Sequence, residues 1–295
     1  NNISQSKELT SFLNLISQAW ETYKKNFSLF AGIIAIPIVF QTVISLLSLK
    51  AKGFLSLSLL ISLLSFVIYF WAAAALIHAI TKPEISVKEA YLQTKDKVIP
   101  YIWVAFLVGL ITSAGFFLFI IPGIIFSVWF SVSLFTLVIE DKRGLDALLK
   151  SKEYVKGYGF DVFIRMFLLI AVVFVAAFIL GTLSLLFGSF GSILASIILT
   201  LVFTPVSLVF AYSIYQELKN IKGQEITPSS SKTPFILLAV LGLVAPIIIT
   251  AIFGFAVLVA LLNSGLDYDN NINTPQNEQQ LQDQIQKELQ KNYFN

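Results

Sequence analysis

The sequence lacks cysteine, has a single histidine and has few charged residues, which account for 13% of its 295 positions. The absence of cysteine excludes disulfides, thiolate metal sites and cysteine nucleophiles. Neither a glycine-rich phosphate loop nor a serine in a nucleophile-elbow setting is present, so we expect no enzyme activity. With one histidine, a metal site would need carboxylates from several loops, and we expect no metal or other cofactor. A net charge of +3 is too small to indicate a nucleic-acid partner.

Long apolar runs are the dominant feature of the sequence. Hydrophobic residues make up 57% of the chain, and the mean hydropathy is +0.82. Nearly uncharged runs of about 20 residues recur, and each is long enough to cross a bilayer as a helix. This pattern predicts an all-α fold, a polytopic transmembrane helical bundle of about seven spans. The expected spans are residues 27–49, 54–80, 100–121, 123–139, 160–187, 193–215 and 234–262.

Residues 98–139 form an uncharged stretch of 42 residues. A single helix of that length would extend about 63 Å, roughly twice the hydrocarbon thickness of a bilayer. Pro122 removes a backbone donor and Gly123 accepts unusual backbone angles, so the pair predicts a tight turn between two antiparallel helices. A single kinked helix is the alternative interpretation.

The distribution of Lys and Arg supports this hairpin and orients the chain. Fifteen of the 20 basic residues fall in alternate segments between the spans, beginning with residues 1–26, and a sixteenth, Arg165, lies just inside the span that follows one of these segments. Basic loops stay in the cytoplasm, so we expect a plasma-membrane protein with a cytoplasmic N-terminus and an extracytoplasmic C-terminus. The expected organisation is an N-terminal interfacial amphipathic helix (1–26), a six-span core (27–222), a cytoplasmic linker (223–233), a seventh span (234–262) and a tail (263–295).

The tail is rich in Asn and Gln and carries several acidic residues. Leu281, Ile285 and Leu289 lie four residues apart, which predicts a short helix at 276–291 that could bind a partner. The same composition is also typical of disordered tails, and both interpretations stay open.

Three cytoplasmic segments resemble one another. Each has an apolar stripe at helical spacing and is followed by two spans, so the expected unit is amphipathic helix, span, span, repeated three times. Such helices lie in the membrane interface with their Lys residues toward lipid headgroups. The alternative is that any Lys-rich linker between spans has this character. The aligned positions are Ala19, Ala90 and Ala147, with Lys24, Lys95 and Lys152 five residues later.

Ionisable residues are almost absent from the middle of the expected spans, which argues against ion-coupled transport. Near the cytoplasmic ends, Glu140 closes the fourth span, and Asp161 and Arg165 share a helix face at the start of the fifth. These could bind a lipid headgroup, or they could be solvated helix ends. The candidate residues for lipid or partner contact are Lys24, Lys95, Lys152, Glu140, Asp161 and Arg165. We predict no catalytic or metal-binding residue.

Uncharged polar residues within the spans have two interpretations. Gln41 and Thr42 in the first span, and the row Ser192, Ser196 and Thr200 in the sixth, could line a path through the membrane. Packing between helices is the commoner role of such residues in lipid. Prolines within the spans are expected to kink their helices. They are Pro37, Pro205 and Pro246.

Between residues 116 and 157 the sequence has an apolar run, a Pro-Gly pair, a second apolar run, an acidic residue and a short helix closed by Gly. The residues concerned are Pro122, Gly123, Glu140, Ala147, Leu148, Ser151 and Gly157. With the segment AWETYKKNF, these features resemble a bacterial multi-pass membrane family of unknown function related to the membrane domain of glycerophosphodiester phosphodiesterases, over residues 9–220. The resemblance implies a non-enzymatic six-span module, from which the seventh span and tail depart. No catalytic phosphodiesterase domain is present.

Two functional hypotheses follow. The first is a non-catalytic integral membrane protein that organises lipids, anionic ones among them, or partner proteins at the cytoplasmic leaflet through its interfacial helices. A membrane-protein partner or a second copy of the chain fits this hypothesis. The second is a permease or lipid translocator with a passage between the repeats. It requires a polar-lined cavity, which would have to be lined by Gln41, Thr42, Ser196 and Thr200.

Overall fold

The computed structural model describes residues 9–50, 55–223, 231–272 and 275–293. All regular secondary structure in these ranges is helical, which confirms the predicted all-α class. The contacts divide the chain into two units, one ending at Gly242 and one beginning at Leu243, and each is described by itself.

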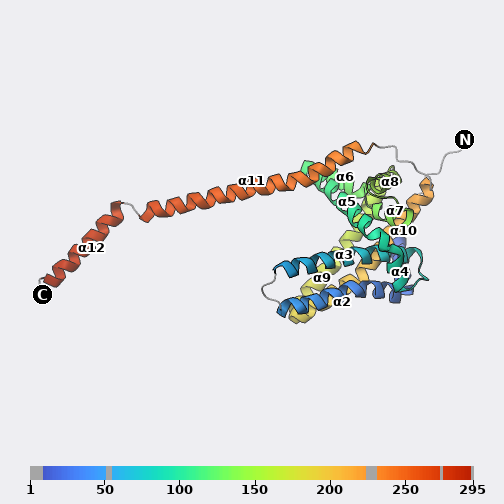
Figure 1. The fold of residues 1–295 in the computed structure, drawn as a ribbon, viewed down its shortest axis with the longest axis horizontal. Coiled ribbons are helices and arrows are strands. Elements are labelled where there is room, and N and C mark those ends of the chain that lie inside the picture. The colour runs from blue at the N-terminus through green and yellow to red at the C-terminus, as the bar shows by residue number, and fades with distance from the viewer. Residues whose placement is uncertain (1–8, 51–54, 224–230, 273–274, 294–295) are drawn as a thin grey trace. The chain divides into compact units, whose positions relative to one another are not determined.

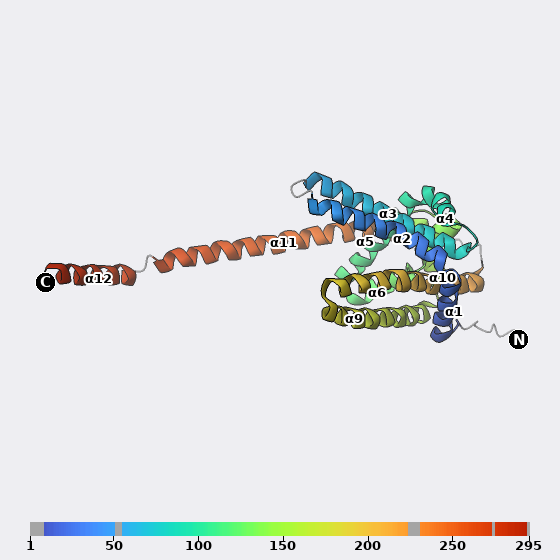
Figure 2. The ribbon, with the colours of Figure 1, turned by 90° about the horizontal axis from the view of Figure 1, so that it is seen from below.

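The first unit repeats one order of elements three times, a short helix followed by a pair of longer helical segments. Figures 1 and 2 show α2 beside α3, and α10 beside α9. The first set is α1 (Phe12–Lys25), α2 (Phe27–Lys50) and α3 (Leu55–Thr81). The second is α4 (Val87–Thr94), the 3₁₀ turn η1 (Lys95–Lys97), α5 (Val98–Leu118), α6 (Ile120–Trp129) and α7 (Ser133–Glu140). The third is α8 (Leu145–Val155), α9 (Gly159–Ile198), the π-helical turn η2 (Leu199–Phe203) and α10 (Thr204–Lys222).

Several segments are long and apolar enough to cross a membrane, so the chain is a multi-pass membrane protein. Among the described residues, six segments meet this criterion by themselves. The helices α1 and α2 are bent by 81° at their junction, and they make a seventh span if they are counted as one. The predicted number of about seven lies at the upper end of this range. The six are Leu60–Thr81, Val87–Leu118, Ile120–Glu140, Gly159–Gly188, Phe190–Lys222 and Thr233–Leu262.

The predicted helical hairpin is present, but its turn lies at Phe119 rather than at Pro122 and Gly123. Phe119 is extended, and α6 begins at the next residue. Pro122 stands in the first turn of α6, where a backbone donor would have no helical acceptor, so proline is tolerated there. The chain then returns alongside α5, since Lys97 at the start of α5 donates a hydrogen bond to the carbonyl of Val138 in α7.

Gly123 serves close packing instead of the turn. A Cβ atom at Gly123 would lie 2.4 Å from the ring of Phe116, and one at Gly115 would lie 2.8 Å from the Cα of Gly123. The two glycines therefore let α5 and α6 approach more closely than any larger residue would allow.

The expected fourth span is not one continuous helix, because it breaks between α6 and α7. Two serine hydroxyls bind carbonyls at the break, Ser133 that of Phe130 and Ser151 that of Trp129, both at 2.7 Å. Ser151 comes from α8, so the third repeat satisfies backbone groups that the break exposes.

The chain also reverses within residues 159–222. Gly188 has φ 57° and ψ −140°, a backbone conformation that favours glycine. This position lies at the start of the expected turn between the spans 160–187 and 193–215.

The short helices of the three repeats are packed on protein. The aligned residues Ala19, Ala90 and Ala147 are each fully buried, which agrees with equivalent positions in a repeat. Each of these helices contacts another helix of the first unit, since α1 packs on α10, α4 on α3 and α8 on α7, and their placement in the membrane interface stays a prediction. Some apolar side chains of α1, such as Leu13, remain exposed.

The last described elements are α11 (Thr233–Ile272) and α12 (Pro275–Tyr293). Within the first unit, the start of α11 packs on the core, with the rings of Phe235 and Phe130 5.9 Å apart. The second unit holds the rest of α11 and all of α12. The helix α12 covers the segment 276–291, for which a short helix was one of the two interpretations.

Candidate functional site

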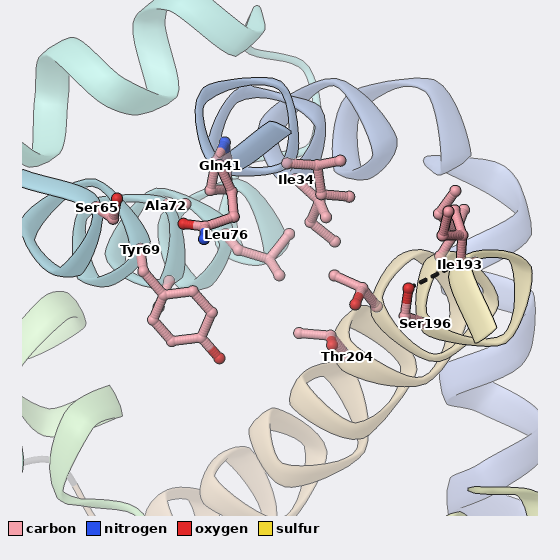
Figure 3. A pocket seen from close by; sticks show the side chains of 14 residues that line it. Ile34, Gln41, Ser65, Tyr69, Ala72, Leu76, Ile193, Ser196 and Thr204 are labelled. Carbon is pink, nitrogen blue, oxygen red and sulfur yellow. Dashed lines mark hydrogen bonds between the residues drawn. The ribbon is translucent and has the colours of Figure 1, made fainter. Parts of the chain in front are cut away.

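A cavity of about 500 Å³ lies between the helices of the first repeat and those of the third. Its walls come from α2 and α3 on one side and from α9, η2 and α10 on the other (Figure 3). Most of the wall is apolar, and no charged residue lines it among the described residues. The polar side chains in the wall are Gln41, Ser65, Tyr69, Ser196, Thr200 and Thr204.

Proline and tyrosine position the α2 wall. Pro37 lines the cavity and has no backbone N–H, so the carbonyl of Ile33, four residues earlier, receives no helical hydrogen bond from it. The hydroxyl of Tyr91, from α4, donates to that carbonyl at 2.9 Å. The carbonyl of Tyr91 in turn accepts from the indole N–H of Trp71 in α3 at 3.0 Å. The short helix of the second repeat thus fixes α2 and α3 relative to each other.

A second proline shapes the opposite wall. Pro205 cannot donate to the carbonyl of Leu201, and its ring would clash with that carbonyl in a regular α-helix. The chain adopts the wider π-helical turn η2 directly before α10, which relieves this conflict. Thr200 lies in η2 and Thr204 begins α10, so the widened turn presents both side chains to the cavity.

The hydroxyls in the wall differ in how they are satisfied. Ser65 donates to the carbonyl of Ile61 at 2.9 Å, and Ser196 to that of Ile193 at 2.8 Å. The hydroxyls of Tyr69, Thr200 and Thr204 make no hydrogen bond within the part of the chain that the structure describes. Figure 3 shows Tyr69 and Thr204 on opposite sides of the same open space. Three hydroxyls are therefore available to a bound molecule or to water.

Glu140 is the centre of a second polar group, the Glu140 cluster, formed with Lys150, Tyr154, Tyr215 and Lys219. Its Oε2 lies 2.5 Å from Nζ of Lys150 in α8. Its Oε1 accepts from the hydroxyls of Tyr154 at 2.8 Å and Tyr215 at 2.5 Å, and lies 3.2 Å from Nζ of Lys219. Only 9% of the Glu140 side chain is exposed.

The Glu140 carboxylate is fully paired within the cluster. Both carboxylate oxygens have partners, and these come from α8 and α10, so the cluster ties α7 to two helices of the third repeat. A carboxylate with all its partners in place has no vacant position for a ligand, and it stabilises the packing that surrounds it. Outside the spans, burial and then the Glu140 carboxylate raise the pKa of Tyr154 above its ordinary value of 10.0.

Sequence reasoning identified Glu140 but missed its four partners. A signal was present, because Lys150 and Tyr154, and likewise Tyr215 and Lys219, lie four residues apart on their helices. Two Lys and Tyr pairs at this spacing, together with an acidic residue at the end of a span, are a pattern that the sequence analysis could have used.

Arg165 and Asp161 lie together, as predicted, but apart from the Glu140 cluster. The guanidinium of Arg165 donates to the carbonyls of Leu9 at 2.8 Å, Thr10 at 3.0 Å and Asp161 at 3.0 Å. The backbone N–H of Thr10 also donates to Glu217 in α10 at 3.3 Å. Arg165 is 9% exposed, so its donors hold the segment before α1 against α9.

The three aligned lysines have different surroundings. Lys24 pairs with Glu21 at 2.7 Å, and both side chains are at least half exposed. Lys95 is exposed in η1. The ammonium group of Lys152 lies 4.6 Å from the centre of the Trp129 ring. The lysines sit on α1, η1 and α8, and the contact of any of them with lipid stays a prediction.

The described residues hold no group of three or more His, Cys, Asp and Glu side chains that could bind a metal ion. Comparisons of the chain with protein-family models, with curated proteins and with solved structures find no match.

Proposed function

We propose that the chain is a non-catalytic protein of a bacterial plasma membrane that binds a membrane lipid in the cavity between its first and third repeats. The single observation that carries the proposal is the lining of this cavity. Gln41, Ser196 and Thr200, three of the four residues that a lipid path would need, line it. The side chain of the fourth, Thr42, lies outside the described residues.

The character of the cavity suits a lipid. Small-molecule sites have volumes of roughly 300–1,000 Å³ and are mostly apolar, with a few polar groups that fix orientation. A cavity of about 500 Å³ has these properties, with a mainly apolar wall and three hydroxyls that have no partner among the described residues. The absence of charged residues from the described wall argues against coupling to ions or protons.

The lysine-based hypothesis has less support. The ammonium of Lys152 is close to the rings of Trp129 and Phe235, and Lys24 has a carboxylate partner. We therefore favour a lipid held within the helices over lipids held at the headgroup surface. In this proposal the N-terminus is cytoplasmic, as the basic loops indicate.

Native mass spectrometry of the full chain tests the proposal. Ala73→Trp places an indole in the cavity from α3, and Ser196→Trp does so from α9. Both should reduce the amount of co-purified lipid several-fold. Ala251→Trp on α11 is the matched control, because Ala251 is exposed and does not line the cavity. Size-exclusion chromatography confirms that each variant is folded.

Equal amounts of retained lipid in all variants would contradict the proposal. So would a complete absence of retained lipid from protein extracted in a mild detergent, if added lipid also fails to bind. Loss of lipid in the Ala251→Trp control would show that a new indole anywhere on the surface displaces lipid.

A further inference from the structure

We infer that the cavity selects an uncharged two-chain lipid whose polar part accepts hydrogen bonds, such as a diacylglycerol, over an anionic phospholipid. The inference rests on the proposed function and names the ligand class of the same site. It follows from three features of the walls, taken in turn: their charge, their free donors and a second cavity beside them.

The absence of charged residues from the described wall disfavours an ionised headgroup. None of the described residues that line the cavity is charged, and an ionised group without a partner is costly to bury away from water. Two cations of the third repeat, Arg165 and Lys219, already have other partners. Arg165 donates to three backbone carbonyls, and Lys219 lies 3.2 Å from the Glu140 carboxylate.

The hydroxyl groups in the wall indicate that the polar part of the ligand accepts hydrogen bonds. The hydroxyls of Tyr69, Thr200 and Thr204 come from α3, η2 and α10, and the described residues supply no hydrogen-bond partner for them. A threonine hydroxyl in a helix usually donates to a carbonyl three or four residues earlier, as Thr182 does to Phe178 at 2.8 Å. Thr200 and Thr204 do not, and their hydroxyls can donate to the ester and hydroxyl oxygens of a neutral glycerolipid.

A second cavity gives the ligand room for a second chain. It has about 490 Å³ and lies between α9 and the segment formed by η2 and α10. Thr200 and Thr204 line both cavities, so these two residues lie between them. The remaining wall of the second cavity is mainly apolar, with Val173, Phe203 and Leu208 among its residues. A lipid with its polar part at the threonines can place one chain on each side of η2.

Photo-crosslinking of the full-length protein tests the inference. The probes are a diacylglycerol and a phosphatidylglycerol with the same diazirine-bearing chains, added to the purified protein in detergent at equal concentrations. The diacylglycerol should label peptides that contain residues of the two cavities several-fold more than the phosphatidylglycerol does. Each donated hydrogen bond contributes about 0.5–1.5 kcal/mol, or roughly two- to tenfold in affinity.

Isosteric variants test whether the threonine hydroxyls bind the diacylglycerol. The pair Thr200→Val and Thr204→Val removes both donors at nearly constant volume and should lower diacylglycerol labelling by about fourfold or more. Thr182→Val is the control, because this exposed hydroxyl on α9 lines neither cavity. It should leave the labelling unchanged.

The outcomes separate the inference from the proposed function. Stronger cavity labelling by phosphatidylglycerol would overturn the inference and leave lipid binding intact. Equal labelling by both probes, or labelling of the double valine variant at the level of the control, would overturn it in the same way. Labelling of no cavity peptide by either probe would overturn both the inference and the proposed function.

Discussion

The Glu140 cluster and the cavity are two polar regions between the described helices, and they differ in how their polar groups are paired. In the Glu140 cluster each carboxylate oxygen has a partner, and the side chains of Tyr154 and Tyr215 are almost fully buried. In the cavity the hydroxyls of Tyr69, Thr200 and Thr204 have no partner among the described residues. A closed network contributes to stability, and an open set of donors is available for binding. Removing a tyrosine hydroxyl should therefore lower stability in the Glu140 cluster and leave it almost unchanged in the cavity.

The largest effect should come from breaking the closed region at its centre. Glu140→Gln leaves Lys150 buried without its counter-charge, and we expect a loss of about 3–5 kcal/mol in the free energy of unfolding. Glu21→Gln is the control, since it breaks the exposed pair with Lys24 and should cost less than about 1 kcal/mol. Denaturant unfolding in detergent micelles measures both. Equal losses would show that the buried pair contributes no more than the surface pair does.

A matched pair of tyrosine variants compares the two regions directly. Tyr215→Phe removes a hydrogen bond to a buried carboxylate and should cost about 1.5–3 kcal/mol. Tyr69→Phe removes a hydroxyl without a described partner and should change the stability of the lipid-free protein by less than about 0.5 kcal/mol. A larger loss of stability for Tyr69→Phe than for Tyr215→Phe would contradict the view that the Glu140 cluster stabilises the fold and the cavity hydroxyls do not.

Packing should be less tolerant where α5 and α6 approach closely than elsewhere on α5. Gly123→Ala would place a Cβ 2.4 Å from the Phe116 ring, and we expect a loss of about 1–3 kcal/mol. Gly109→Ala is the control, because no atom lies within 4 Å of a Cβ at that position of α5. It should be neutral or stabilising by up to about 1 kcal/mol. Thermal unfolding of the two variants in the same detergent compares them, and similar melting temperatures would contradict the close approach of α5 and α6.

The smallest expected effect is a dependence on pH. Burial raises the pKa of Tyr154, so the folded protein favours the neutral phenol. The resulting stabilisation is complete below pH 10 and is lost as the pH rises further, by less than about 1.4 kcal/mol per pH unit. Tyr154→Phe lacks this contribution, so its stability should fall less steeply than that of the unchanged protein above pH 10. Parallel pH profiles would contradict it.

Local patterns in the sequence predicted much of this fold, because apolar runs determine where helices can cross a membrane. The class, the hairpin and the repeated order of elements were all accessible in this way. The position of the turn was not, since Pro122 is as compatible with the first turn of a helix as with the turn before it. Composition favoured proline and glycine over Phe119, whose side chain is mostly exposed and gives no local signal for a turn.

The site was only partly predictable. Gln41, Ser196 and Thr200 were candidates because polar residues are rare within apolar runs. Tyr69 and Thr204 also line the cavity, but nothing in their local sequence distinguishes them from residues that pack against lipid. The partners of Glu140 were missed because they meet only through the packing of α7, α8 and α10.

The hydrogen bond from Tyr91 to the carbonyl of Ile33 has a mechanical consequence. It joins the short helix α4 to the point in α2 where Pro37 leaves a backbone acceptor without a helical donor. Ile34 and Pro37, one and four residues further on, are part of the cavity wall. Any force that displaces α4, whether from a partner or from the membrane surface, would therefore act on this hydrogen bond and, through α2, on the wall of the cavity.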